Sequence, residues 1–412
     1  MIRNILCIAL SLVFTKTSAQ SPSESPYFTN GSWLGLLKND KNKTINFNFD
    51  VQVLMNKKVI NIYNADEKLF VDDIKNVGDS IHVVMPFFDS EFMFKAHADS
   101  LHGYWKKNLA NSSVRMPFVA YKNKNRFPEV KAISTNKFDG TWATYFINAN
   151  KDTSFAIAEF KSVKDKVYGT FLSSTGDDRY LEGVSDGKKL WLSSFDGSHA
   201  YRYEMELSAD GKSIVNGKLY SGKSGYSEFY SEFKPNAKLP DADQLTFLKD
   251  GFNTIDFKFK NIEGKEISLD DDQYKNKIVL IQIMGSWCPN CMDESYYLME
   301  YYKNTDRSKI EIIGLCYERS ADFTVASRNV QRMKERIGIE YELLIAGTNA
   351  KGNVNESLPM LKNFIAFPTM IILDKNHIVR KIHTGYSGPA TGKHYVEFKY
   401  EFENFIKTLI NE

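Results

Sequence analysis

The sequence predicts an α/β C-terminal domain, with a mixed central sheet flanked by helices, preceded by an all-β N-terminal region. Three patterns indicate this division. Residues 278–284 form a continuous apolar run rich in β-branched side chains, which is typical of a strand covered on both faces. Residues 45–53 and 201–207 alternate apolar and polar side chains, the period of half-buried strands. Residues 323–337 and 395–409 instead repeat apolar side chains every three or four positions, as amphipathic helices do.

Length and charge limit the organisation and the partners. A chain of 412 residues is long enough for two or three domains with substantial cores. Its 53 basic and 51 acidic residues give a net charge of +2, so there is no electrostatic case for binding nucleic acid or an acidic membrane surface. The four cysteines are too few for a disulfide scaffold.

Residues 1–19 have the pattern of a secretory signal peptide. Arg3 supplies positive charge, residues 5–14 form a short apolar core, and residues 17–19 are small enough for cleavage before Gln20. The apolar core is too short to span a bilayer, and no other segment is a candidate. We therefore expect a protein exported to the periplasm or cell envelope, where disulfides form, and not an integral membrane protein.

The β-rich region shows signs of an internal repeat. Two motifs recur at an offset of roughly a hundred residues: Gly31-Ser32-Trp33 matches Gly140-Thr141-Trp142, and Phe88-Asp89-Ser90 matches Phe195-Asp196-Gly197. We expect two related antiparallel units at 20–128 and 129–234. A linker at 235–244, with two prolines and little apolar content, then leads to the α/β domain at 245–412.

No catalytic constellation stands out in the β-rich region. Strand histidines are more often surface or satisfied core residues than metal ligands, and those of this region are scattered: His82, His97, His102 and His199. Its tryptophans can line a ligand groove, but aromatic residues of sheets more often fill the core: Trp33, Trp105, Trp142 and Trp191.

Periodicity predicts the elements of the C-terminal domain in order. A hairpin at 257–269 precedes the strand at 278–284, and a helix follows whose apolar positions include Met292, Tyr296, Met299 and Tyr302. We then expect a strand at 310–316, a helix ending at Gly338, a strand at 341–346 and a short helical connection at 358–364. A hairpin at 370–382 and a C-terminal helix complete the domain.

Two cysteines lie where the apolar strand gives way to a helix. Cys288, Pro289, Asn290 and Cys291 follow Trp287, and proline suits a first helical turn. The unpaired amides and the dipole of a helix N-terminus stabilise an anion, so the thiolate of Cys288 should be favoured over the thiol. Cys291 lies one turn deeper and can attack a mixed disulfide formed at Cys288. We therefore expect a redox pair with an exposed Cys288 sulfur.

A structural disulfide and half of a zinc site are the alternatives to a redox pair. A bridge across two residues closes too small a loop to constrain the unfolded chain much. The sequence has no second close cysteine pair, and His377, His383 and His394 lack the spacing of zinc ligands. We expect neither a metal nor another cofactor, and Cys316 fits a buried apolar position.

Residues 245–412 resemble the thioredoxin-like thiol-disulfide oxidoreductases of the TlpA/ResA type, which overlap with the alkyl hydroperoxide reductase/thiol-specific antioxidant group. The resemblance rests on Asn261-x-x-Gly264-Lys265, on Trp287-Cys288-Pro289-Asn290-Cys291, on an extra strand and helix after the first crossover, and on Phe367-Pro368-Thr369. It implies a thioredoxin-like fold and an enzyme that, in typical members, reduces protein disulfides in the periplasm.

The resemblance also implies roles for single residues. Cys288 would attack and Cys291 would resolve, while Pro368 takes the place of the family's cis-proline, with Trp287 and Phe367 beside the substrate. Glu294 matches a carboxylate of the family, and one helical turn puts it on the face of Cys291, whose proton it could accept. The alternative for Glu294 is a solvated helix acid, which is what we expect of Asp293.

Three positions depart from the family pattern. Gln282 stands six residues before Cys288, where thioredoxins carry a buried acid, so proton transfer must rely on Glu294 or water. Ser295 stands where the family usually has proline, which puts the helix geometry in question. His377 stands where a turn glycine is common, and we expect it at the surface.

The sequence therefore favours an exported thiol-disulfide oxidoreductase that reduces disulfide-containing proteins and is re-reduced by a membrane-bound electron donor. One alternative is a thiol peroxidase, although the Pro-x-x-x-Thr-x-x-Cys setting of a peroxidatic cysteine is absent. The other alternative, an envelope binding module, makes the β-rich region the functional centre, because of its bulk and its aromatic content.

Overall fold

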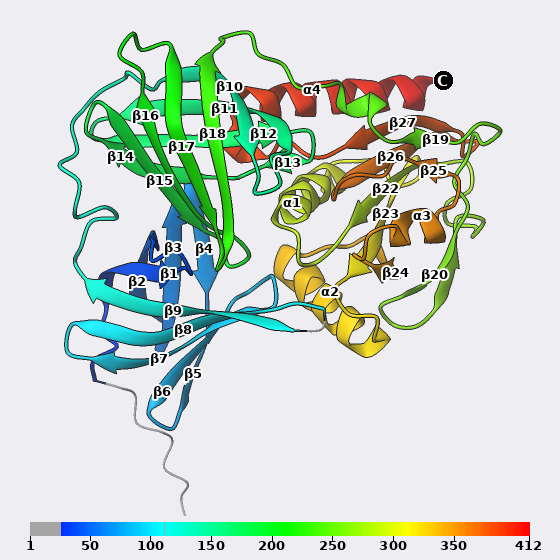
Figure 1. The fold of residues 1–412 in the computed structure, drawn as a ribbon. Coiled ribbons are helices and arrows are strands. Elements are labelled where there is room, and N and C mark those ends of the chain that lie inside the picture. The colour runs from blue at the N-terminus through cyan, green and yellow to red at the C-terminus, as the bar shows by residue number, and fades with distance from the viewer. Residues whose placement is uncertain (1–25, 111) are drawn as a thin grey trace, which may run out of the picture.

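The computed structural model of the protein describes residues 26–110 and 112–412, and the signal peptide expected at 1–19 lies outside them. Two β-sheets form the N-terminal half and lie beside an α/β domain, whose helices α1 (Pro289–Lys303) and α2 (Phe323–Ile337) face them (Figure 1). We refer to residues 26–233 as the β-region and to residues 245–412 as the C-terminal domain.

The first sheet is an antiparallel array of nine strands: β1 (Gly31–Lys38), β2 (Thr44–Leu54), β3 (Lys57–Asn64), β4 (Glu67–Val71), β5 (Asp73–Val77), β6 (Ser80–Val84), β7 (Ser90–His97), β8 (Ser100–Asn108) and β9 (Ser113–Lys122). Their order is β4-β3-β2-β1-β9-β8-β7-β6-β5, so the first and last strands pair in the middle of the sheet. The alternation at 45–53 lies within β2, where Phe47, Phe49 and Val51 are buried.

The second sheet follows the same plan with the strands β10 (Gly140–Ile147), β11 (Thr153–Val163), β12 (Lys166–Ser173), β13 (Gly176–Asp177), β14 (Leu181–Ser185), β15 (Lys189–Phe195), β16 (Ala200–Leu207), β17 (Ser213–Ser221) and β18 (Gly225–Phe233). Their order is β11-β10-β18-β17-β16-β15-β14-β12-β13, and β11 also pairs with β12, which closes this sheet on itself.

The two sheets begin alike. Gly31 and Gly140 start their first strands at φ 118° and 116°, a region that favours glycine. The indole nitrogen of Trp33 donates to the carbonyl of Thr29 (3.2 Å), and that of Trp142 donates to Phe138 (2.8 Å). A common origin of the two sheets stays a prediction. Three of the four tryptophans are buried and one is half-buried, which favours packing over a ligand groove for this set: Trp33, Trp105, Trp142 and Trp191.

The C-terminal domain contains the strands β19 (Phe247–Leu248), β20 (Lys258–Asn261), β21 (Glu266–Ser268), β22 (Ile278–Met284), β23 (Ile310–Glu318), β24 (Glu342–Thr348), β25 (Leu361–Lys362), β26 (Thr369–Leu373) and β27 (Val379–Thr384). Its other helices are α3 (Asn353–Ser357), α4 (Lys393–Asn411) and the 3₁₀ turn η2 (Pro389–Thr391), and a further 3₁₀ turn, η1 (Ala242–Gln244), lies just before the domain. The main sheet has the order β21-β20-β24-β23-β22-β26-β27, with parallel pairs only among β22, β23 and β24, so the sheet is mixed as expected.

The central strand β22 is covered on both faces, which explains why its sequence is apolar throughout. Ile278, Leu280 and Met284 pack into one hydrophobic cluster with α1, α2 and α4. Val279 and Ile283 pack into a second cluster on the opposite face, which includes residues of α3 and of the hairpin β20–β21. Because both faces are covered, no polar alternation is needed.

Two expectations for the C-terminal domain are wrong in detail. Tyr296 is 44% exposed, so it does not belong to the buried stripe of α1. The helical connection lies at 353–357 and not at 358–364, where β25 occurs instead. Pro359 supplies the physical reason, because the residue before a proline is disfavoured in the α conformation and Leu358 therefore ends α3.

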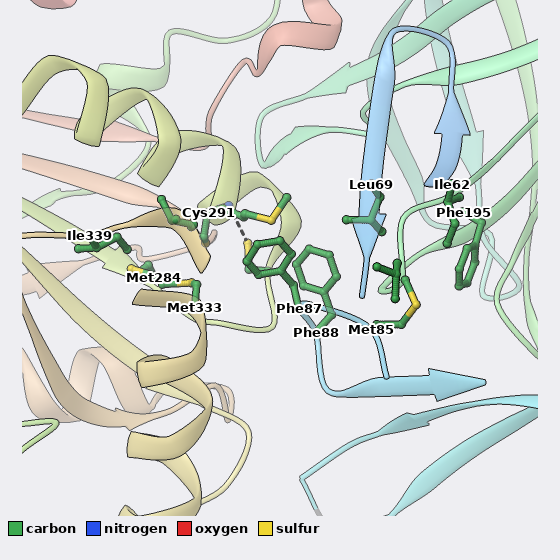
Figure 2. Packing of buried hydrophobic residues seen from close by; sticks show 14 of the residues in the cluster. Ile62, Leu69, Met85, Phe87, Phe88, Phe195, Met284, Cys291, Met333 and Ile339 are labelled. Atoms are coloured by element: carbon green, nitrogen blue, oxygen red, sulfur yellow. Dashed lines mark hydrogen bonds between the residues drawn. The ribbon is translucent and has the colours of Figure 1, made fainter. Parts of the chain in front are cut away.

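The β-region and the C-terminal domain share one continuous hydrophobic cluster. Figure 2 shows Phe87 and Phe88, from the turn before β7, between the C-terminal side chains around Cys291 and the β-region side chains around Met85. Two arginines add polar contacts to this interface: Arg332 of α2 donates to the carbonyl of Met85, and Arg319 donates to that of Asn108 (2.8 Å).

Candidate active site

The two cysteines meet at the start of α1. Cys288 is the N-cap residue, with extended backbone, and its Sγ accepts a hydrogen bond from the backbone N–H of Cys291 (3.3 Å). Pro289 occupies the first turn, where its missing N–H leaves no intrahelical bond unmade. Cys288, Cys291 and Cys316 are free thiols in this structure. The helix N-terminus therefore presents an amide to the sulfur that we expect to attack.

The residues expected at the substrate lie around Cys288. The peptide bond between Phe367 and Pro368 is cis, and the Cys288 thiol donates to the carbonyl of Phe367 (Sγ···O 3.6 Å). The rings of Trp287 and Phe367 pack edge to face at 5.5 Å. The indole N–H of Trp287 donates to the carbonyl of Tyr317 (2.8 Å), which holds the ring against β23. The structure thus brings Trp287, Phe367 and Pro368 together with the cysteine pair.

Glu294 lies behind the cysteines in a buried pocket. Gln282 donates from Nε2 to Glu294 Oε2 (2.8 Å) and to the carbonyl of Cys291 (3.3 Å), so one amide bridges the acid and the resolving cysteine. Glu294 Oε1 is buried and has no hydrogen-bond partner within the described part of the chain. Burial raises the pKa of Glu294 to about 8, and it also raises the pKa of the Cys291 thiol. Glu294 is therefore not a solvated helix acid.

Two of the departures from the family pattern join the same network. Ser295 Oγ donates to Gln282 Oε1 (3.1 Å), and the hydroxyl of Tyr341 donates to the same oxygen (3.3 Å). The helix α1 continues unbroken through Ser295, so the absence of proline does not disturb it. Gln282 thereby has partners on both ends of its amide, as a buried polar side chain requires.

Asp293 is not the solvated helix acid that the sequence predicts. Its Oδ1 accepts from Nη2 of Arg179 in the β-region (3.0 Å), and its side chain is only 10% exposed. Arg179 also pairs with Glu67 of the first sheet and lies 3.8 Å from Asp196. Burial raises the pKa of Asp293 to about 8, with Arg179 opposing the shift and the neighbouring carboxylates adding to it. Sequence reasoning missed this pair because nothing local connects α1 to Arg179.

Glu318 is a second buried acid that sequence reasoning missed. Its two carboxylate oxygens accept from the backbone N–H and the hydroxyl of Ser286, both at 2.7 Å. These bonds hold the loop between β22 and Trp287. Burial raises the pKa of Glu318. The only sequence signal is its place at the end of β23, beside the end of β22.

A cleft of about 520 Å³ opens above Cys288, between the C-terminal domain and the second sheet. The C-terminal side contributes Trp287, Ile365 and Phe367, while the β-region contributes Asp178, His199 and Tyr201. Cys288 itself is only 6% exposed, so the expectation of an exposed sulfur is wrong. The reason is tertiary, because the β-region covers the side of the helix N-terminus that local sequence leaves open.

His199 is the one β-region histidine that lines this cleft. Its Nδ1 lies 3.3 Å from the carboxylate of Asp196, and its ring stacks on Tyr201 at 5.0 Å. Although burial opposes the shift, the charges of His199 and Arg179 lower the pKa of Asp196. Asp196 also accepts from the backbone N–H groups of Ser198 and His199, and so fixes the loop that carries His199. The repeated motif Phe195-Asp196-Gly197 was therefore the sequence signal that could have pointed to His199.

His377 and Cys316 do not line the cleft. His377 adopts φ 58° in the turn before β27 and its ring contacts the carbonyl of Tyr274 (2.9 Å), so it is half-buried and not the surface residue that the sequence predicts. Cys316 is fully buried on β23. Among residues 26–110 and 112–412, no three His, Cys, Asp or Glu side chains converge on a point that could hold a metal ion. Every helix of that part of the chain falls short of the length or apolar character that a membrane crossing requires.

Comparison with known proteins assigns the chain to a family. Residues 251–382 match the AhpC/TSA family. The thiol-disulfide oxidoreductase ResA of Geobacillus thermodenitrificans is 28% identical over 142 residues, which cover 34% of this chain and 73% of the relative. ResA of Bacillus cereus is 30% identical over 137 residues, covering 32% of this chain and 68% of the relative. The chain belongs to the ResA-type thiol-disulfide oxidoreductases.

This ResA-type protein is thus an oxidoreductase, and the resemblance inferred from Trp287-Cys288-Pro289-Asn290-Cys291 is confirmed at the level of the family. The thioredoxin domain of a thiol-disulfide oxidoreductase from Bacteroides vulgatus is similar with 19% identity and a TM-score of 0.27, covering 37% of this chain and 99% of that one. The AhpC/TSA match begins at residue 251, after the β-region, so the family match does not account for the β-region.

Proposed function

We propose that this ResA-type protein is exported and reduces protein disulfides through the dithiol Cys288/Cys291. The observation that carries the proposal is the placement of Cys288 Sγ at the N-terminus of α1, with the N–H of Cys291 donating to it and the Cys291 sulfur buried behind it. The partners would be disulfide-containing proteins, and the reaction needs no cofactor.

The first step uses the substrate-facing side of the site. The thiolate of Cys288 attacks one sulfur of the substrate disulfide, and the other substrate sulfur leaves as a thiolate that takes a proton. The helix dipole and the Cys291 N–H stabilise the attacking anion. Trp287, Phe367 and Pro368 surround Cys288 and would hold the substrate segment next to it.

The second step uses the buried side. Cys291 must lose a proton before it attacks the Cys288–substrate bond, although burial disfavours its thiolate. Glu294 is the neighbouring group that could take this proton when it is ionised, near or above its pKa of about 8, because Gln282 bonds both to its carboxylate and to the Cys291 backbone. The substrate then leaves reduced, and the enzyme carries a Cys288–Cys291 disulfide.

The oxidised enzyme needs an electron donor, which we propose to be membrane-bound and to act outside the cytoplasm. The signal-peptide pattern of residues 1–19 supports export to the periplasm or cell envelope. We also propose the domain limits 20–128, 129–234, 235–244 and 245–412; in support, one sheet runs within 31–122 and the other within 140–233.

Insulin reduction tests the assignment of the attacking thiol. The pre-reduced wild-type protein should reduce insulin, and Cys288→Ser should abolish the activity. Cys291→Ser should instead accumulate a mixed disulfide on Cys288, detectable by mass spectrometry. Cys316→Ala is the matched control and should retain the activity, since the Cys316 thiol is fully buried and cannot reach a substrate. An undiminished rate in Cys288→Ser would contradict the proposal, and stopped-flow oxidation by hydrogen peroxide would reveal a peroxidase.

The direction of electron flow is tested by the reduction potential of the pair. Equilibration with a thiol buffer should give a potential nearer to that of thioredoxin, about −270 mV, than to that of an oxidant such as DsbA, about −120 mV. A value close to the second would make the protein an oxidase.

A further inference from the structure

Seven of the 21 residues that line the active-site cleft come from outside the family's domain. Asp178 and His199, from loops between strands of the second sheet, and Tyr201 of β16 line the same cleft as Cys288 and Phe367. Along the chain, Tyr201 lies 87 residues and Asp178 lies 110 residues before Cys288. Any molecule that reaches the Cys288 sulfur, which is 6% exposed, must pass between the two walls.

Polar contacts on both sides of the cleft hold the β-region wall in place. Asp177 accepts from the backbone N–H of Gly388 (2.8 Å), and Arg179 binds Asp293 (3.0 Å). The backbone of Gly176 approaches Asn290 so closely that a Cβ there would lie 2.0 Å from the Asn290 amide nitrogen. These contacts lie beside the cysteine pair. They fix the β-region wall to the C-terminal domain, so the wall is part of the active site.

The two walls offer different side chains to a bound molecule. The C-terminal wall carries an apolar strip of Phe364, Ile365 and Phe367, with Ile365 44% exposed, and polar side chains beside it: Asn290, Asn349, Lys351 and Asn355. The β-region wall is polar, with the carboxylate of Asp178 and the stacked pair of His199 and Tyr201. An extended polypeptide presents successive side chains to opposite sides, which suits a cleft with an apolar strip on one wall and polar side chains on the other.

We propose that His199 and Tyr201 are specificity-determining residues, which bind the polypeptide segment that flanks the substrate cysteine. The inference rests on the proposed function and extends it to the β-region. A cleft of about 520 Å³ holds a few residues of extended chain and not the face of a folded protein, which typically buries about 800 Å² per partner. The disulfide must therefore lie on a flexible segment.

The chemical step is unchanged by this assignment. The Cys288 thiolate bonds to one sulfur of the substrate, the substrate S–S bond breaks, and the other sulfur departs and is protonated. Cys291 then gives up its proton and displaces the substrate from Cys288. Two electrons pass from the enzyme dithiol to the substrate, and no further reactant is needed for one turnover. His199 and Tyr201 act only by holding the segment in line for the attack.

The test measures selectivity in the full chain. The pre-reduced protein is given an unstructured peptide with a disulfide and, separately, 2-hydroxyethyl disulfide, which has no flanking chain. We expect His199→Ala and Tyr201→Ala each to lower the ratio of kcat/KM values, peptide over small disulfide, by roughly tenfold. Tyr230→Ala is the matched control, an exposed tyrosine of the same sheet outside the cleft, and should leave the ratio as in the wild type.

A second measurement does not depend on how the wall variants fold. A peptide with a photoreactive group next to its cysteine is trapped on Cys288 in the Cys291→Ser variant and irradiated. Crosslinks within residues 173–201 would support the assignment, while crosslinks confined to the C-terminal domain would overturn it. An unchanged selectivity ratio in folded wall variants would also overturn it. Failure of the wild type to reduce either disulfide would instead contradict the proposed function.

Discussion

At the scale of single residues, two adjacent acids of α1 serve different purposes. Asp293 points to the β-region and binds Arg179, whereas Glu294 points into the domain and meets Gln282. Burial raises the pKa of each to about 8. Only Glu294 shares a hydrogen-bonded amide with Cys291, so only Glu294 is placed to exchange a proton with the resolving thiol.

Replacing Glu294 by glutamine should slow the second step and spare the first. At pH 8 and above, where Glu294 of the wild type is ionised, the variant lacks this proton acceptor and Cys291 forms its thiolate more slowly; loss of a general base typically costs about 10²-fold or more. Rapid-quench mass spectrometry should show the mixed disulfide accumulating during turnover. Glu300→Gln, an exposed acid on the same helix, is the control. Equal rates of resolution in Glu294→Gln and wild type would remove Glu294 from the mechanism.

The same residue should make stability depend on pH. The native carboxyl keeps its proton up to about pH 8, whereas the unfolded one loses it near 4.5. The native state therefore binds more protons in that window, so the free energy of unfolding falls as pH rises from about 5 to 8.

Glu294→Gln should remove this contribution. In urea denaturation, the variant should gain stability relative to wild type by roughly 2–4 kcal/mol at pH 8, with little gain at pH 5. A difference between the two proteins that does not change with pH would show that Glu294 titrates normally in the native state.

At the scale of elements, α2 shows how strongly local sequence sets a boundary. Its N-cap, Asp322, accepts from the backbone N–H of Val325 (2.9 Å). Gly338 ends the helix in the left-handed conformation, at φ 77°, and its N–H donates to Lys334 (2.8 Å). The predicted end at Gly338 is therefore confirmed by the helix itself.

Gly338→Ala should cost about 1 kcal/mol of stability, because an alanine in the left-handed region clashes with its own backbone. A Cβ at this position meets no atom within 4 Å, so the loss isolates the conformational effect. Gly338→Asn should lose less, since asparagine tolerates that region better. Urea denaturation measures both, and an alanine variant as stable as wild type would contradict the explanation.

At the scale of the whole molecule, Arg179 joins three parts of the chain. It lies in the loop between β13 and β14, and it binds Glu67 of the first sheet and Asp293 of α1. All three side chains are buried. Removing one charge therefore leaves the others buried without a partner, which strongly destabilises the folded state.

Arg179→Met should destabilise the protein by about 3–5 kcal/mol at pH 9, above the pKa of about 8 of Asp293, because it leaves buried carboxylates without a cation. Scanning calorimetry should also show the β-region and the C-terminal domain unfolding in separate transitions. Adding Asp293→Asn should restore part of the loss, because one of those carboxylates then carries no charge. Arg380→Met, which alters a surface arginine, is the control and should change little. A double variant no more stable than Arg179→Met would argue against the charge explanation.

The sequence by itself determined the features that depend on neighbouring residues. The apolar run 278–284, the cysteines at the following helix start and the end of α2 at Gly338 all arise from local periodicity and capping, and the structure has them where expected. The helical connection was misplaced although its signal, Pro359, is also local.

Only the tertiary structure decided which polar side chains are buried and what faces Cys288. Asp293 and Glu294 are neighbouring acids of one helix, yet one meets Arg179 from 114 positions away and the other meets Gln282. His199 and Tyr201 reach the cleft because the second sheet packs against α1. Contacts of this kind depend on how whole sheets and helices pack, and the period of a strand or helix carries no information about its distant partner.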